Sequence, residues 1–98
     1  QDYSGVIADL NKVIEINPQD AKAYYNRGVS KNNLQDYHGA IADFSKAIEL
    51  NPQYVAAYFN RGVSMYDLGN KTEACVDWSK AGELGFEKAY DLIREYCN

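Results

Sequence analysis

The chain has 98 residues, enough for one small domain or for a short array of repeats with a continuous core. Its apolar fraction of 46% and charged fraction of 24% are ordinary for a globular protein, which argues against disorder. The net charge of −4 argues against nucleic-acid binding, and no apolar stretch approaches the ~20 residues of a membrane span. We therefore expect neither a nucleic-acid partner nor membrane insertion.

The sequence repeats itself with a fixed period of 34 residues. Residues 1–19 and 35–53 are identical at 13 of 19 positions, and residues 21–54 and 55–88 are identical at 15 of 34. Such a period over nearly the whole chain indicates a repeat architecture. Residues 1–17 match only the second half of a period, so we expect them to form the second helix of a truncated repeat.

An open apolar face is expected on this first helix, within residues 3–14. Its members are Val6, Ile7, Leu10 and Val13. We expect that further repeats precede this helix in a longer protein. An uncovered apolar face of this kind also favours dimerisation, so a homodimer through residues 3–14 is one hypothesis.

Residues 21–52 contain two helical patterns. One broad apolar face runs along Ala21–Asn33, and apolar residues recur at three- and four-residue steps in 37–50 (YHGAIADFSKAIEL). A short turn at Leu34–Asp36 joins the two helices, and a proline blocks continuation of the second. Residues 55–86 repeat the arrangement. Helix pairs of this length cannot bury both faces alone, so they are expected to stack.

Small and charged residues recur at the same period. Gly28 and Gly62 lie in mid-helix, where glycine costs about 1 kcal/mol relative to alanine, so we expect a second helix to approach them closely. Arg27 and Arg61 precede these glycines. Three aspartates recur at the same period and are their candidate partners in structural ion pairs between helices: Asp9, Asp43 and Asp77.

The last segment, residues 87–98, is amphipathic and occupies the slot of a further first helix. It lacks the Asn-Arg-Gly signature, so we expect a capping helix and the C-terminus of the parent protein. Cys75 and Cys97 are too few for a disulfide framework. Both lie in apolar helical patterns, so the sequence predicts free structural thiols that pack as small core residues.

No sequence pattern points to catalysis or to a metal. His38 is the single histidine, there is no CxxC pair, and no phosphate-binding glycine loop is present. His38 is interpreted as a solvated residue at a helix start and Asp36 as a cap or turn residue. We expect no enzymatic activity, no cofactor and no metal site.

The repeat resembles the tetratricopeptide repeat. The resemblance depends on an aromatic early in the first helix, a glycine four residues later, small residues flanking an aromatic in the second helix, and a closing proline. These positions are Tyr24, Tyr58, Gly28, Gly62, Ala40, Ala74, Phe44, Trp78, Ala47, Ala81, Pro18 and Pro52. The resemblance implies an all-α, right-handed α-solenoid of antiparallel helix pairs, with about two and a half units and a C-terminal capping helix.

Two departures from the family pattern are clear. Arg27 and Arg61 replace the usual leucine before the glycine. The last unit ends in Gly85 and Phe86 in place of Asn-Pro, and this ending looks partly like the related Sel1-like repeat.

The resemblance implies a protein–protein interaction scaffold that binds a peptide or partner helix in a concave groove lined by the first helices. The ligand-binding residues carried over by register are Lys22, Tyr25, Asn26, Val29, Asn32, Asn33, Phe59, Asn60, Val63, Tyr66, Asp67, Tyr90 and Arg94. Ala56 and Ile93 occupy groove slots as well. Two ladders follow from the same register: Tyr25, Phe59 and Ile93 form one, and Val29, Val63 and Cys97 form the other. Ordinary core packing is the alternative interpretation of these ladders.

The groove chemistry implied by the resemblance is mixed. The side-chain amides of Asn26 and Asn60 are candidates to bind a peptide backbone. The family members that grip the acidic tails of heat-shock chaperones use a clamp of Lys, Asn and Arg. This chain keeps two clamp residues and replaces the others: Asn60 and Arg94 are kept, whereas Tyr25, Val29 and Tyr90 are the replacements. A ligand with apolar side chains is therefore favoured over a chaperone tail. The cellular compartment stays open, with the cytoplasm slightly favoured.

Overall fold

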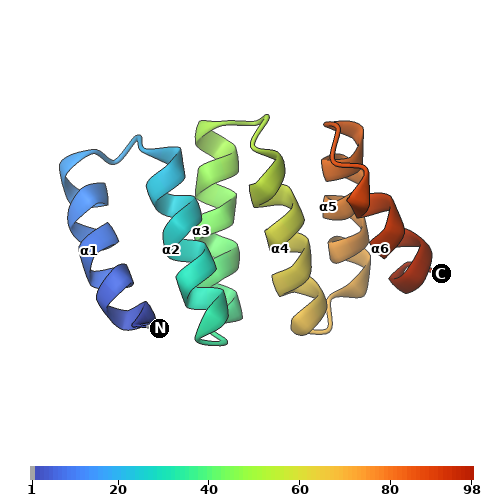
Figure 1. Ribbon diagram of the computed structural model, residues 1–98, viewed down its shortest axis with the longest axis horizontal. Helices are drawn as coiled ribbons and strands as arrows, with labels where there is room; N and C mark the ends of the chain where they lie inside the picture. Colours follow the sequence, from blue (N-terminus) through green and yellow to red (C-terminus); the bar gives the residue numbers. More distant parts are fainter. Residues whose placement is uncertain (1) are drawn as a thin grey trace.

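The computed structural model describes residues 2–98, and all the regular secondary structure in that part of the chain is α-helical. The elements are α1 (Tyr3–Ile16), α2 (Ala21–Asn33), α3 (Tyr37–Leu50), α4 (Val55–Asp67), α5 (Lys71–Glu83) and α6 (Lys88–Tyr96). They lie side by side in chain order, each antiparallel to the one before it (Figure 1). The result is an elongated helical solenoid of 41 × 25 × 19 Å, as expected. Residue 1, which the sequence places in the first helical segment, lies outside the described residues.

The first three helices begin at aspartates that cap them. The side chain of Asp2 accepts a hydrogen bond from the Gly5 N–H at 2.9 Å, and Asp36 accepts one from the Gly39 N–H at 3.0 Å. Asp20 does the same at the start of α2. Such caps satisfy backbone donors that have no partner inside the helix. The predicted ranges of α2 and α3 are confirmed, as is the capping role of Asp36.

Within the stack, α2 packs most extensively on α3, and α4 on α5. A Cβ atom built on Gly28 would lie 2.8 Å from the Phe44 ring, and one on Gly62 would lie 2.6 Å from Trp78 Nε1. Both distances are too short for real atoms. The glycines are therefore required by close approach of the second helix, which confirms the prediction made from their mid-helix positions.

The core lies between the helices of these two pairs. Several of its residues are fully buried alanines, among them Ala40, Ala47, Ala74 and Ala81. Phe44 and Trp78 lie between them and are almost inaccessible to solvent. By contrast, α1 contains no buried residue. The unit boundaries 1–17, 21–52, 55–86 and 87–98 remain predictions.

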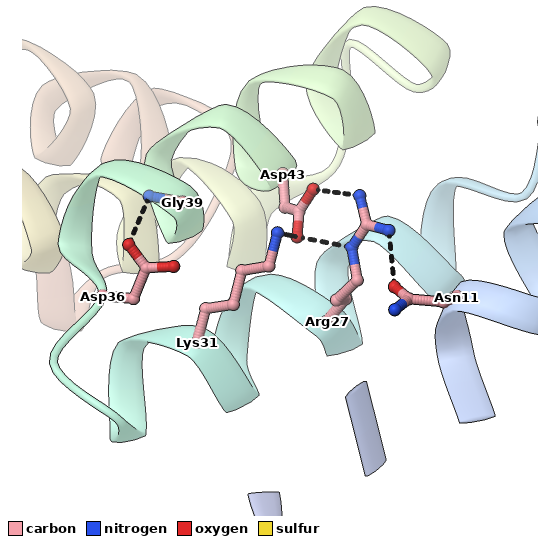
Figure 2. Close-up of polar contacts among 6 residues, drawn as sticks. All are labelled: Asn11, Arg27, Lys31, Asp36, Gly39 and Asp43. Carbon is pink, nitrogen blue, oxygen red and sulfur yellow. Dashed lines mark hydrogen bonds and ion pairs between the residues drawn. The ribbon is translucent and has the colours of Figure 1, made fainter. Parts of the chain in front are cut away.

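Two arginines link three helices each. Arg27 on α2 donates to both carboxylate oxygens of Asp43 on α3, at 2.8 and 2.7 Å, and to Asn11 on α1 at 2.9 Å (Figure 2). Lys31 adds a contact of 3.1 Å to the same carboxylate. The hydrogen bonds to Asp43 raise the pKa of Arg27 further above its ordinary value, so the side chain stays charged.

The second arginine repeats this arrangement one period later. Arg61 makes two bonds to Asp77, at 2.8 and 2.7 Å, and a third to Ser45 on α3 at 3.1 Å. The predicted structural ion pairs are therefore confirmed for Asp43 and Asp77. Asp9, at the equivalent position on α1, is exposed and takes part in none of the ion pairs found in residues 2–98.

The prediction of two free thiols is wrong. Cys75 on α5 and Cys97 at the end of α6 form a disulfide, with their Cα atoms 5.9 Å apart. The physical reason is the antiparallel return of α6 along α5, which brings the C-terminal cap of α6 beside the second turn of α5. Cys97 consequently has no free thiol at the ladder position that it shares with Val29 and Val63.

Candidate functional site

The candidate site is the surface formed by α2, α4 and α6, which we call the α2/α4/α6 face. A hollow of about 370 Å³ opens on it between α2, α4 and the turn before α6. Its lining residues are Tyr25, Val55, Ala56, Phe59, Asn60 and Phe86. Most of this lining is apolar side-chain surface, which suits an apolar side chain of a ligand.

Tyr25 and Asn60 form the polar side of this hollow. The Asn60 side-chain amide donates a hydrogen bond of 2.7 Å to the Tyr25 hydroxyl, which joins α4 to α2. Burial raises the pKa of Tyr25, and the hydrogen bond from Asn60 opposes part of that rise. The Tyr25 ring also packs on Phe44 and on Tyr54, at centroid distances of 5.7 and 5.0 Å. One N–H of the Asn60 amide is therefore used within the protein, and its expected role as a donor to a peptide stays a prediction.

Phe59 and Phe86 form the apolar side of the hollow. Their rings meet edge to face with centroids 4.9 Å apart. The Phe59 carbonyl also accepts a hydrogen bond of 3.2 Å from the Trp78 indole N–H, which ties α4 to α5. The position of Phe59 in the hollow is therefore fixed by two contacts, one with the Phe86 ring and one with the Trp78 indole.

A second hollow, of about 230 Å³, lies further along α4. Three predicted site residues, Val63, Tyr66 and Asp67, line it together with Trp78, Leu92 and Tyr96. The Tyr66 ring lies 5.1 Å from the Tyr96 ring and 5.8 Å from the Trp78 ring. Tyr66 is thus an exposed aromatic that is anchored on two others.

The predicted residues of α6 line a third, more polar hollow. Tyr90 and Arg94 line a space of about 450 Å³ with Glu87, Lys88 and Asp91. Arg94 is paired with Asp91 one turn earlier on the same helix. Tyr90 covers Gly82 of α5, where a Cβ atom would lie 2.6 Å from the tyrosine ring. Tyr90 therefore helps to hold α6 on α5 as well as facing outward.

The remaining predicted residues lie outside these three hollows. Lys22 and Asn33 are exposed at the two ends of α2, and Asn26 and Val29 are half-buried between them. Asn32 accepts a hydrogen bond of 2.7 Å from the Ser64 hydroxyl, so it links α2 to α4.

Two residues of the first hollow, Val55 and Phe86, were not predicted. Phe86 belongs to the unusual ending of the last unit, where Gly85 adopts a φ of 111° that favours glycine. The departure from Asn-Pro was therefore the signal, because it placed an aromatic residue where earlier units have proline.

Residues 2–98 contain no cluster of three or more metal-binding side chains. None of the helices described is both long and apolar enough to cross a membrane.

Comparisons with known proteins agree on the fold. Two family models described as tetratricopeptide repeat match the sequence, at residues 21–54 and 44–76, and together they span more than half of the chain. No curated protein matches the sequence.

Solved structures of the same fold include two that contain a bound peptide. The first TPR of Spaghetti (RPAP3) bound to the HSP90 peptide SRMEEVD has a TM-score of 0.91 and 28% identity, over 97% of this chain and 77% of that one. The second TPR of Spaghetti, bound to the same peptide, has a TM-score of 0.84 and 27% identity, over 86% and 78%.

A structure of MamA has a TM-score of 0.83 and 28% identity. The match covers 86% of this chain but only 50% of the MamA chain. Helix order, glycine contacts, family models and solved structures all lead to one assignment. The chain belongs to the tetratricopeptide repeat family and is a protein–protein interaction scaffold.

Proposed function

We propose that the chain binds an extended peptide or a partner helix on its α2/α4/α6 face, with an apolar side chain of the ligand in the first hollow. The observation that carries this proposal is the apolar lining of that hollow, with Phe59 and Phe86 on one side. Support also comes from two similar TPR structures that hold a peptide. The wider ligand-contact set is proposed to include the predicted residues at the three hollows and along α2.

An acidic tail such as SRMEEVD, the peptide bound in those two structures, is not the proposed ligand. The first hollow presents a tyrosine hydroxyl and an amide that already bond to each other, in Tyr25 and Asn60. Arg94, a cation at the far end of the face, is paired with Asp91. A ligand carboxylate would meet no cation among the lining residues of the first hollow, whereas an apolar side chain would bury area against two phenylalanines.

The test compares two alanines that are both exposed on helices. Ala56 lines the first hollow, whereas Ala42 lies on α3 and lines none of the three hollows. Peptides are first selected from a displayed random library on the immobilised chain, and their Kd is then measured by fluorescence polarisation. We expect Ala56→Gln to weaken binding at least about tenfold, because the longer side chain fills the hollow, and Ala42→Gln to change it less than about twofold.

The SRMEEVD peptide serves as the reference ligand in the same assay. The proposal expects it to bind more weakly than the selected peptides. Equal binding to wild type and Ala56→Gln by every selected peptide would exclude the first hollow as the ligand site. Stronger binding of SRMEEVD than of apolar peptides would overturn the proposed ligand class.

A second candidate function is assembly through α1, and a specific observation favours it. Val6 and Val13 are 44% and 39% exposed, yet the alanines one period later, Ala40 and Ala47, are completely buried. On α3 this face is covered by α2. The same face of α1 therefore has the pattern of a helix–helix contact surface.

The charge on this face indicates the kind of partner. Asp9 occupies the position of Asp43, which pairs with Arg27 of the covering helix. A second α1 would bring another Asp9, so like charges disfavour a symmetric homodimer through residues 3–14. We propose instead that an amphipathic helix of the α2 type, with an arginine opposite Asp9, covers α1.

The probe for this second candidate is a synthetic peptide of residues 18–36, which contains α2 and its caps. We expect it to bind the full chain, and to bind an Asp9→Asn variant more weakly. Sedimentation of the chain alone is the companion measurement. A concentration-dependent dimer that the peptide does not dissociate would support self-association and contradict the arginine-bearing partner.

A further inference from the structure

The disulfide lies at the edge of the proposed binding site and connects its last helix to the rest of the stack. It joins Cys75 on α5 to Cys97, the C-terminal cap of α6, across a sequence separation of 22 residues. Neither cysteine is buried. Both line an open hollow of about 650 Å³ on the surface of α5, with Lys71 and Lys80 among the other lining residues. The disulfide is therefore within reach of a reagent in solution.

The position of α6 determines one end of the α2/α4/α6 face. Tyr96 packs on Tyr66 and Trp78, with ring centroids 5.1 and 6.2 Å away. Tyr66 and Tyr96 together line the second hollow. Tyr90 and Arg94, two predicted ligand contacts, lie on α6 itself. If α6 left α5, the second and third hollows would lose part of their walls.

α6 has little intrinsic stability of its own. It contains nine residues, and no side chain caps its N-terminus. Isolated helices shorter than about 12–15 residues are marginal in water. The one helix against which α6 packs extensively is α5. Its attachment therefore depends mainly on the α5 interface, on the contact of Tyr96 with Tyr66 of α4, and on the disulfide.

We infer that Cys75–Cys97 is a thiol–disulfide exchange site, and that its reduction releases α6 and weakens ligand binding on the α2/α4/α6 face. The effect on binding rests on the function proposed above, whereas the release of α6 does not. The reductant is a dithiol. Disulfides persist in oxidising surroundings and are reduced by cellular thiol systems, so the two states correspond to two environments.

The exchange proceeds in two steps through a mixed disulfide. One thiolate of the dithiol attacks a sulfur of the disulfide, the S–S bond breaks, and a mixed disulfide forms while the other cysteine leaves as a thiolate. Lys71 and Lys80 line the same hollow as the two cysteines, together with Glu83. The second thiolate of the reductant then breaks the mixed disulfide. Two electrons and two protons pass to the cysteines, and the reductant becomes a disulfide.

Amide hydrogen exchange of the whole chain, with and without dithiothreitol, tests the release of α6. We expect the amides of residues 91–97 to exchange at least about tenfold faster in the reduced protein, while those of α3 stay unchanged. A Cys97→Ser variant should exchange like the reduced protein in both conditions. Because α2–α5 retain their contacts, we expect this variant to fold, and it reports on α6 without any added reductant.

The outcomes separate the two parts of the inference. Protection of residues 91–97 that agrees within about twofold between oxidised and reduced protein would overturn the release of α6. Release of α6 with unchanged affinity for the selected peptides would overturn the control of binding. If no peptide binds in either state, the proposed function fails. Amide exchange of residues 91–97 still shows whether reduction releases α6.

Discussion

At the scale of single residues, Gln35 in the turn after α2 adopts a left-handed backbone conformation, which residues with a Cβ atom disfavour. Gln35 has a φ of 64°, whereas the equivalent residue one period later is Gly69, with a φ of 92°. A left-handed backbone conformation destabilises the folded state by about 1–2 kcal/mol when the residue has a Cβ atom. Glycine avoids this strain, but its greater freedom in the unfolded chain costs about 0.5–1 kcal/mol of stability. We expect Gln35→Gly to raise the free energy of unfolding by about 0.5–1 kcal/mol, measured by urea denaturation.

The reverse change at Gly69 is the matched control for this prediction. A Cβ atom there would meet no other atom within 4 Å, so the substitution tests backbone conformation alone. Gly69→Gln should lower the free energy of unfolding by a similar amount. A destabilising Gln35→Gly would mean that the glutamine side chain contributes contacts that outweigh its backbone strain.

The paired aspartates give a second prediction at this scale. Asp43 is buried and accepts hydrogen bonds from Arg27 at two oxygens, with Lys31 nearby. Asp43→Asn keeps the shape but removes the charge, which leaves two cations without their partner in a half-buried site. Because Arg27 retains some solvent contact, we expect a loss of about 2 kcal/mol in the free energy of unfolding.

Asp9→Asn is the control, because Asp9 has the same register on α1 but is exposed and outside the ion pairs described. It should change the unfolding free energy by less than about 0.5 kcal/mol. Urea denaturation measures both variants. Equal effects of the two substitutions would show that general charge balance, and not the specific pair, determines the stability.

At the scale of the helices, the closest approach in the stack gives a third prediction. A Cβ atom on Gly62 would lie 2.6 Å from Trp78 Nε1 and 3.2 Å from the backbone carbonyl of Ala74. Gly62→Ala gains about 1 kcal/mol in helix propensity, but overpacking costs about 1–3 kcal/mol, and here one neighbour is backbone that cannot rotate away. We expect net destabilisation, with a shift in the emission of Trp78, the single tryptophan. A stabilised variant would show that α4 and α5 can separate at little cost.

The elements also show why much of this fold is readable from the sequence. The 34-residue period, the mid-helix glycines and the recurring Arg–Asp pattern each report a contact that is repeated, so the same constraint appears twice in the chain. The contacts that occur once were harder to predict. The hollow beside Phe86 and the hydrogen bond between Tyr25 and Asn60 depend on side-chain positions, which the period does not specify.

The disulfide is the clearest of these single contacts. Counting cysteines favoured free thiols, because two cysteines do not make a disulfide framework. The period nevertheless contained a signal, since it places Cys75 and Cys97 at the positions of Ile41 and Val63, on the neighbouring helices α3 and α4. Register together with helix order would have brought the two cysteines to facing helices.

At the scale of the whole molecule, the two ends of the stack differ in how they are held. Each helix contacts mainly its neighbours in sequence, so stability is close to a sum of interfaces and the ends open first. At one end, α1 has one neighbour and no buried residue. At the other end, α6 also has one extensive neighbour but is joined to it by the disulfide. The oxidised protein should therefore open mainly from the α1 end.

This asymmetry gives the last prediction, which concerns the order of opening along the chain. In the oxidised protein, α1 amides should exchange at least about tenfold faster than α3 amides after correction for intrinsic rates, with α6 intermediate. An α2-type peptide bound on α1 should slow α1 exchange and leave α6 unaffected, since no interface is shared between them. If α1 exchanged as slowly as α3 without any partner, its exposed face would already be stable in water. The case for a covering helix would then be lost, whereas the disulfide and the α2/α4/α6 face would be untouched.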